Sequence, residues 1–281
     1  MKKMDAFEHE DIRDFEPEAK IGLIATINLQ GQPHITLISS IRAKTITQLI
    51  WGQFTEGLSK SHVKTNPKTG FLILTMDKQL WRGKATWTHE ETHGEDYEMY
   101  NNQPMFRYNA YFGINTVHHM DLVETYGREN LPLGHIVISS LLTKIAKSSA
   151  KTVTKGHILK PWAEALFNRL SALKFITYID NEGFPRIIPL LQCQASNSRR
   201  ISFSPLAYQE ELSSIDTGTT VAVFGLTMDM EDILIRGSFV GFDRYRSIRL
   251  GVIDIEWVYN SMPPKQGQIY PPKEVSPVVN F

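Results

Sequence analysis

One phrase of this sequence occurs twice, and the repeat constrains the possible fold more than any other feature. The tetrapeptide LTMD stands at residues 74–77 and again at residues 226–229, a displacement of 152 residues. The same displacement relates two G-x-P turns, one beginning at Gly31 and the other at Gly183. Collinear landmarks at one spacing are the signature of internal duplication. We therefore interpret the chain as two copies of one module.

Further landmarks support two copies of a small β module. Gly83 pairs with Gly237 at a displacement of 154 residues, and YFGINTVHHMDLV resembles RLGVIDIEWVY further on. Each copy spans about a hundred residues, an ordinary domain size. Its short apolar runs, such as HITLIS, QLIWGQF, GFLILTM and ATWTH, are typical of alternating strands. The sequence therefore predicts a small antiparallel barrel in each copy.

The stretches around these strands predict three parts. Residues 1–130 form the first repeat, with an N-terminal helix and a helix and loop inserted at GEDYEMYNNQPMFRYN. Residues 131–172 form a helical connector, since apolar residues recur there at helical spacing and Pro161 marks a helix start. Residues 173–281 form the second, degenerate repeat, which ends in an extended arm from Ser261.

Charge and cysteine content exclude several classes of protein. Thirty Lys and Arg balance thirty Asp and Glu, so no global field favours nucleic acid or an anionic membrane as partner. Cys193 is the single cysteine, which excludes an intrachain disulfide. No apolar run is long enough for a membrane span or a signal peptide. We expect a cytoplasmic protein.

The segment IWGQFTEGLSKSHVKTNPKTGFLIL, residues 50–74, is the best candidate for a binding site. It reads as a strand, a turn, one short helix and a second strand. Ser59 and Lys60 begin the helix and Asn66-Pro67 ends it. A helix start offers free N–H groups and a partial positive charge, which suit a phosphate monoester. The alternative is a capped surface helix with a solvated lysine.

In order and spacing these motifs resemble the FMN-binding split-barrel superfamily typified by pyridoxamine 5'-phosphate oxidase. The resemblance rests on IATINLQGQPHITLI, IWGQF, Ser59-Lys60, Asn66-Pro67, FLILTM and Arg82-Gly83. It implies a six-stranded split barrel that pairs with a second barrel and holds FMN between them. The implied fold is mainly β with α: two tandem split β-barrels forming an intrachain pseudodimer. The duplication would then supply both barrels in one polypeptide.

The resemblance also implies roles for individual residues. It makes Ser59 and Lys60 the ligands of the FMN phosphate. Residues expected along the ribityl chain and ring are Thr36, Ser39, Trp51, Gly52, Gln53 and Phe54. His62 stands where relatives often have asparagine. Ordinary barrel packing is the alternative for Trp51 or Phe54, since neighbouring strand residues face opposite sides. No catalytic residue is assigned, although His62 and Tyr108 are candidates.

The two copies are not equivalent in this region. In the second copy, SPLAYQEELSSIDTGTT has neither the lysine nor the Asn-Pro helix end. We therefore expect one FMN per chain, with its phosphate on the first copy. Arg82 and Arg236 occupy matching positions, where each could bind an anion or form a salt bridge.

A competing motif is HEETH, which satisfies the H-E-x-x-H zinc signature through His89, Glu90 and His93. That signature requires a helix, whereas a strand ending in ATWT runs directly into these residues. We therefore expect no metal site, and a zinc hydrolase is the third hypothesis. The leading one is an FMN-dependent oxidoreductase of unknown small-molecule substrate, as a monomer or a homodimer. The second is a non-catalytic, haem-binding or deazaflavin-binding module on the same barrel.

Overall fold

A computed structural model describes residues 3–16, 19–53, 55–104, 107, 113–152, 156–260 and 267–272. The chain divides into two compact units. The first contains residues 1–131 and 177–187, and the second contains residues 132–176 and 188–281. The three-part division expected from the sequence stays a prediction.

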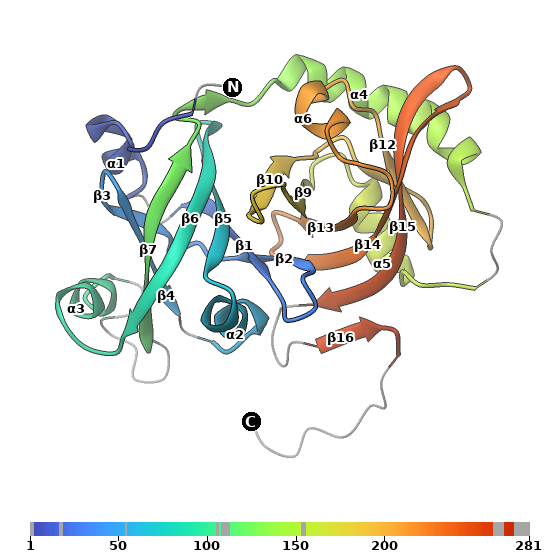
Figure 1. Ribbon diagram of the computed structural model, residues 1–281. Coiled ribbons are helices and arrows are strands. Elements are labelled where there is room, and N and C mark those ends of the chain that lie inside the picture. Colours follow the sequence, from blue (N-terminus) through green and yellow to red (C-terminus); the bar gives the residue numbers. More distant parts are fainter. Residues whose placement is uncertain are drawn as a thin grey trace. The chain divides into compact units, whose positions relative to one another are not determined.

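The first sheet is antiparallel and has eight strands, in the order β2-β1-β5-β6-β7-β4-β3, with β8 paired to β6 (Figure 1). Its strands are β1 (Lys20–Ile27), β2 (Pro33–Leu37), β3 (Arg42–Thr45), β4 (Gln48–Gln53), β5 (Lys68–Thr75), β6 (Gln79–Glu91), β7 (Thr116–Thr125) and β8 (Glu129–Asn130). The core on this sheet includes Trp51, Phe71 and Trp81, which are fully buried.

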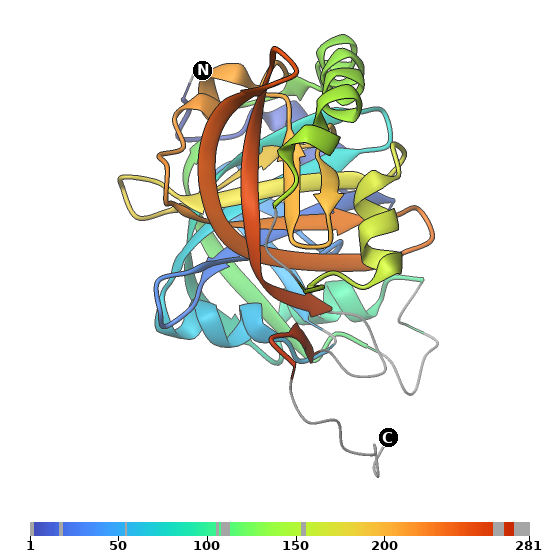
Figure 2. The ribbon, with the colours of Figure 1, turned by 90° about the vertical axis from the view of Figure 1, so that its right-hand side faces the viewer.

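The second sheet repeats the order of seven strands, β10-β9-β13-β14-β15-β12-β11, but its eighth strand, β16, pairs with β15, the counterpart of β7, whereas β8 pairs with β6. Its strands are β9 (Leu173–Ile179), β10 (Pro185–Pro189), β11 (Gln194–Asn197), β12 (Arg200–Phe203), β13 (Thr220–Leu226), β14 (Asp232–Tyr245), β15 (Ile248–Asn260) and β16 (Gly267–Tyr270). Figure 2 shows the long, curved hairpin of β14 and β15. The predicted fold class, mainly β with two similar sheets in tandem, is confirmed.

Equivalent turns carry the same hydrogen bonds in both copies. Asn28 accepts two backbone N–H bonds through its side chain in the first G-x-P turn, and Asp180 does the same in the second. Gly31 and Gly183 adopt φ angles of 72° and 78°, the left-handed region in which glycine is favoured. The duplication read from the sequence therefore extends to backbone geometry.

Helices lie between the strands at the predicted places. They are α1 (His9–Asp14), α2 (Leu58–Thr65), α3 (Glu95–Asn101), α4 (Leu133–Ala146), the 3₁₀ turn η1 (Lys147–Ala150), α5 (Pro161–Asn168) and α6 (Gln209–Ser213). Pro161 begins α5, as predicted, since its missing N–H costs nothing at a helix start. The inserted helix is α3. Most of the C-terminal arm lies outside the described residues, and its described part forms β16.

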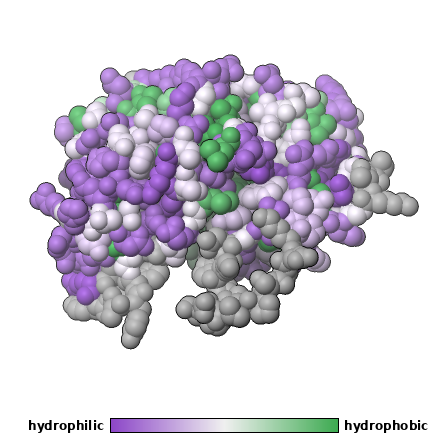
Figure 3. All heavy atoms as spheres, turned by 60° about the horizontal axis from the view of Figure 1, so that its bottom comes forward, coloured by the Kyte–Doolittle hydropathy of each residue, from purple (hydrophilic) through white to green (hydrophobic). Residues whose placement is uncertain are grey.

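The surface carries no large hydrophobic area on the face shown in Figure 3, where hydrophilic residues predominate and hydrophobic ones are scattered. Among the described residues, no helix has the length and apolar character needed to cross a membrane.

Candidate functional site

The helix α2 has the ends that the sequence predicted. Gly57 precedes it in an extended conformation, and Asn66 follows it, with its backbone N–H bonded to the His62 carbonyl. Pro67 then prevents the helix from continuing. The helix packs against β1 and β2, as Figure 1 also shows. Its first turn contains no acidic residue. The free N–H groups of this turn can therefore donate hydrogen bonds to a bound anion.

Two polar side chains at the start of α2 are buried without a partner. Ser59 is fully buried, and its hydroxyl has no hydrogen bond. Lys60 is only 8% exposed, and its ammonium forms no hydrogen bond or ion pair with any residue in the described part of the chain. Buried polar groups are normally satisfied, so the unsatisfied Ser59 hydroxyl beside the Lys60 ammonium favours a ligand site here.

The pKa of Lys60 shows the cost of this burial. Desolvation lowers it from 10.5 to about 8, while the nearby charge of Glu56 opposes the shift. At neutral pH the ammonium is still charged, and a bound anion would relieve its desolvation. The other lysine of this helix, Lys64 in its last turn, is exposed and already paired with Glu90 at 2.8 Å. Lys60 is thus the cation of α2 that remains for a ligand.

Trp51 and Gln53 contact His118 rather than the site at the start of α2. The Trp51 indole is fully buried and stacks on the His118 imidazole, with ring centroids 3.8 Å apart. His118 Nε2 bonds to Gln53 Oε1 at 2.8 Å, while His118 Nδ1 accepts from Trp87 Nε1 at 3.1 Å. Burial lowers the pKa of His118 to about 3, so the ring is neutral with its proton on Nε2. We leave Trp51 out of the proposed cofactor site because it belongs to the barrel core.

The other predicted cofactor residues lie in different settings. Thr36 is buried on β2, and Gly52 lies on β4 against Ile114. Ser39 is exposed in the turn after β2, so its expected place on the strand is wrong: β2 ends at Leu37. Phe54 and Tyr108 lie outside the described residues.

His62 faces the interior from the inner side of α2. Its Nδ1 lies 3.0 Å from the hydroxyl of Thr26, and its ring contacts His34 edge-on at 5.2 Å between centroids. These contacts fix the helix to β1 and β2. They give His62 a structural role, and its part in binding a cofactor stays a prediction.

Arg82 and Arg236 differ despite their matching positions. Arg82 is 1% exposed, donates two hydrogen bonds of 2.9 Å to the Glu129 carboxylate and a third to the Ile187 carbonyl. Arg236 lies over the Trp257 ring at 4.4 Å, and desolvation lowers its pKa. The salt-bridge alternative therefore holds for Arg82.

In its described residues the second copy has no equivalent of the α2 site. Its helix α6 has five residues, and Glu210 and Glu211 lie in its first turn, where they repel an anion. Its buried lysine, Lys174, donates instead to the carbonyls of Arg169 and Leu191. These facts agree with the expectation that only the first copy can bind a phosphate.

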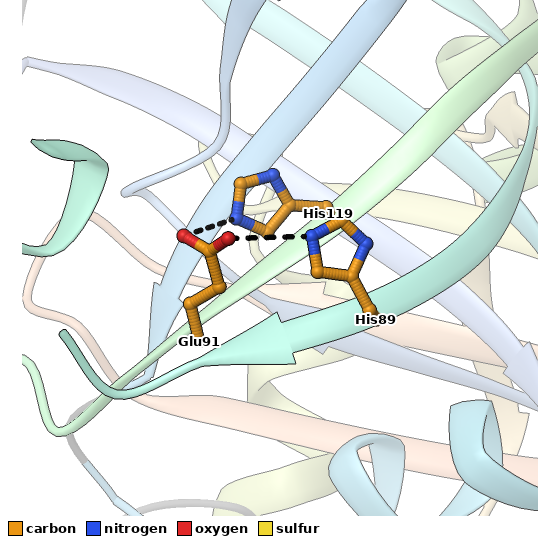
Figure 4. Close-up of side chains that lie close together, drawn as sticks. All are labelled: His89, Glu91 and His119. Carbon is orange, nitrogen blue, oxygen red and sulfur yellow. Dashed lines mark ion pairs between the residues drawn. The ribbon is translucent and has the colours of Figure 1, made fainter. Parts of the chain in front are cut away.

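The HEETH segment is not a helix. β6 continues to Glu91, His93 lies exposed in the following bend, and Glu90 is paired with Lys64. The helical arrangement needed for the zinc hydrolase signature is therefore absent from this segment. The structure instead gathers His89, Glu91 and His119, as Figure 4 shows. From the sequence, only the folding could make His118, His119 or Glu124 a third ligand beside HEETH, and the cluster that forms, with Glu91 and His119 in place of Glu90 and His93, was not predicted.

Comparisons with known proteins give likenesses of fold at low identity. No family model and no curated protein matches the chain. Solved structures that resemble it include HupZ of Group A Streptococcus, at 18% identity and a TM-score of 0.36, covering 43% of this chain and 93% of that one. A candidate pyridoxamine 5'-phosphate oxidase from Lactobacillus delbrueckii has 17% identity and a TM-score of 0.36, covering 45% and 99%.

An FMN-binding protein from Syntrophomonas wolfei has 14% identity and a TM-score of 0.33, covering 41% of this chain and 87% of that one. In each case nearly a whole solved chain corresponds to less than half of this one. We base the functional proposal on the residues of this chain.

Proposed function

We propose that the first half of the chain binds FMN, with the phosphate at the start of α2 against Ser59 and Lys60. The observation that supports this most directly is the buried Lys60 ammonium, which has no partner among the described residues. A phosphate monoester supplies the charge and the acceptor oxygens that this ammonium, the Ser59 hydroxyl and the first N–H groups of α2 all lack.

The bound flavin would supply electron or hydride transfer, which makes a flavin-dependent oxidoreductase the proposed class. The residues of this chain would bind and orient the phosphate end. Lys60 would hold the negative charge, Ser59 would donate its hydroxyl, and Gly57 would leave the entrance open. Gly57 suits this role because a Cβ there would lie 3.3 Å from Lys60 Nζ.

The test compares FMN with riboflavin, which lacks the phosphate, by flavin fluorescence titration. Wild type should bind FMN at least about tenfold more tightly, since a hydrogen bond to a charged group contributes about 1.5–3 kcal/mol. Lys60→Met should remove most of that preference, because methionine keeps the apolar stem and removes the charge. Lys64→Ala, on the same helix, should leave it unchanged.

Two results would contradict the proposal. One is a Lys60→Met protein that is folded and retains the full preference for FMN. The other is an absorption spectrum of the purified protein with a haem Soret band and no flavin bands.

A further inference from the structure

The side chains of His89, Glu91 and His119 meet on one face of the antiparallel pair of strands β6 and β7 (Figure 4). His89 and Glu91 are two residues apart on β6, so their side chains point to the same face. His119 is the cross-strand neighbour of His89 on β7. A β-bulge between Trp87 and His89 produces this register by placing one extra residue, Thr88, in β6.

We propose that these three residues bind a divalent transition-metal ion of the zinc class. The nearest Glu91 oxygens lie 3.6 Å from His89 Nε2 and 3.4 Å from His119 Nε2. A tetrahedral ion with bonds of about 2.0–2.1 Å separates its ligand atoms by about 3.3 Å. Each imidazole Nε2 faces a different Glu91 oxygen, and the ligand atoms of the three residues lie within 4.8 Å of one another, so side-chain rotations would bring them to the spacing of a zinc site.

The buried member of the cluster indicates a missing ligand. His119 is 7% exposed, and its Nε2, which faces Glu91, makes no hydrogen bond. A buried imidazole nitrogen without a hydrogen bond costs free energy, which a bond to a metal ion would recover.

Hydrogen bonding holds His89, the exposed member of the cluster, in the tautomer whose Nε2 can bind a metal ion. The Thr88 hydroxyl donates its single hydrogen to the His119 carbonyl, at 3.2 Å. The 3.0 Å contact between this hydroxyl and His89 Nδ1 must then be donated by the histidine. The proton of neutral His89 is therefore on Nδ1, and its Nε2 lone pair is free towards Glu91. Hydrogen bonds of this kind orient metal-binding histidines in proteins.

Two imidazoles and one carboxylate are the protein ligands of tetrahedral zinc sites whose fourth position holds water or substrate. His89 is more than half exposed, so the fourth position faces solvent. The carboxylate of Asp96, in the first turn of α3, lies 3.9 Å from His119 Nε2 but is held by Lys44 at 2.5 Å. The two imidazole rings are stacked 5° from parallel, so metal binding would tilt them until their lone pairs converge.

Titration of the full chain with zinc chloride, followed by isothermal calorimetry, tests the proposal. Wild type should bind one zinc ion per chain at this cluster. His89→Ala and Glu91→Gln should each weaken binding at least about tenfold, since even losing an outer hydrogen bond to a metal site costs 10–100-fold. His89 is exposed, so its replacement should not unfold the protein. Cobalt substitution should give the visible absorption of a tetrahedral site in wild type and lose it in both variants.

The matched control is His93→Ala, which removes the other histidine of HEETH. It should bind zinc as wild type does, because His93 is exposed and lies outside the cluster. Wild type that binds no zinc, or a His93→Ala variant that loses as much affinity as His89→Ala, would overturn the proposal. Neither result depends on flavin binding, so this proposal and the proposed function fail separately.

Discussion

The two halves of this chain share a backbone and differ in chemistry. Strand order, the G-x-P turns and the glycines at the crowded positions 83 and 237 recur in both. The buried lysines do not correspond: Lys60 lacks a partner among the described residues, whereas Lys174 donates to two carbonyls. Duplication has therefore preserved what the sheet requires and has left side chains at the helix ends free to change.

The largest expected effect is a loss of stability on replacing either of two glycines, Gly83 and Gly237, that occupy equivalent positions in the two halves. A Cβ at Gly83 would lie 2.0 Å from the Glu124 carbonyl oxygen, and a Cβ at Gly237 would lie 1.8 Å from that of Asp254. Replacing either glycine with alanine should reduce the free energy of unfolding by about 3 kcal/mol or more, because backbone must move. Urea unfolding measures this. Gly134→Ala is the control, since nothing lies within 4 Å of that position. A large cost in one half only would break the equivalence.

The next effect is a difference in stability between replacing Arg82 and replacing Arg236, which occupy matching positions but have different partners. Arg82→Met leaves the Glu129 carboxylate and the Ile187 carbonyl without their donor, and should cost about 3 kcal/mol in thermal or urea unfolding. Arg236→Met should change stability by less than about 1 kcal/mol, because it removes a partly buried charge that rests on a ring. The double variant Arg82→Met/Glu129→Gln should recover part of the loss. Equal losses for the two single variants would contradict this asymmetry.

The smallest effect is a pH dependence of stability that comes from Lys60, although burial lowers the pKa of Lys174 in the second half to about 8 as well. The pKa of Lys60 in the folded protein, about 8, lies below the ordinary lysine value of 10.5, so the folded state disfavours its charge. The resulting destabilisation is fully present below pH 8 and disappears as pH rises to 10.5. Lys60→Met should therefore be more stable than wild type near neutral pH, by on the order of 3 kcal/mol at most.

Urea unfolding of both proteins between pH 7 and 10.5 tests this pH dependence, and the difference should shrink as pH rises. Lys174→Met is the comparison from the second half. It should destabilise the protein because it leaves two carbonyls without their donor. A constant difference between wild type and Lys60→Met across this range would show that Lys60 is not desolvated.

Local sequence signals predicted the fold well. Gly31 and Gly183 mark turns that only a few residue types favour, and Asn66-Pro67 ends α2 by a steric rule that acts on neighbouring residues. The site was predicted only in part. That Ser59 and Lys60 begin a helix is local information, but their lack of partners depends on everything packed around them.

The cluster of His89, Glu91 and His119 shows why some candidate sites cannot be predicted from sequence. His89 and His119 are brought together by strand pairing, and the pairing register depends on the bulge at Thr88. No residue pattern within β6 predicts that bulge. The orientation of Trp51 was open for a similar reason, since alternation gives two faces but not which one is buried.

The hairpin formed by β9 and β10 ties the first compact unit to the second copy of the sequence. Residues 177–187 come from the second copy but belong to the first compact unit. There Asp180 and Glu182 hold the Lys84 ammonium at 2.6 and 2.5 Å, with Lys84 only 3% exposed. A shortened reading frame that stopped after residue 131 would leave that cation facing Glu124 with two of its three counterions gone. The first unit thus depends on two carboxylates that the second copy supplies.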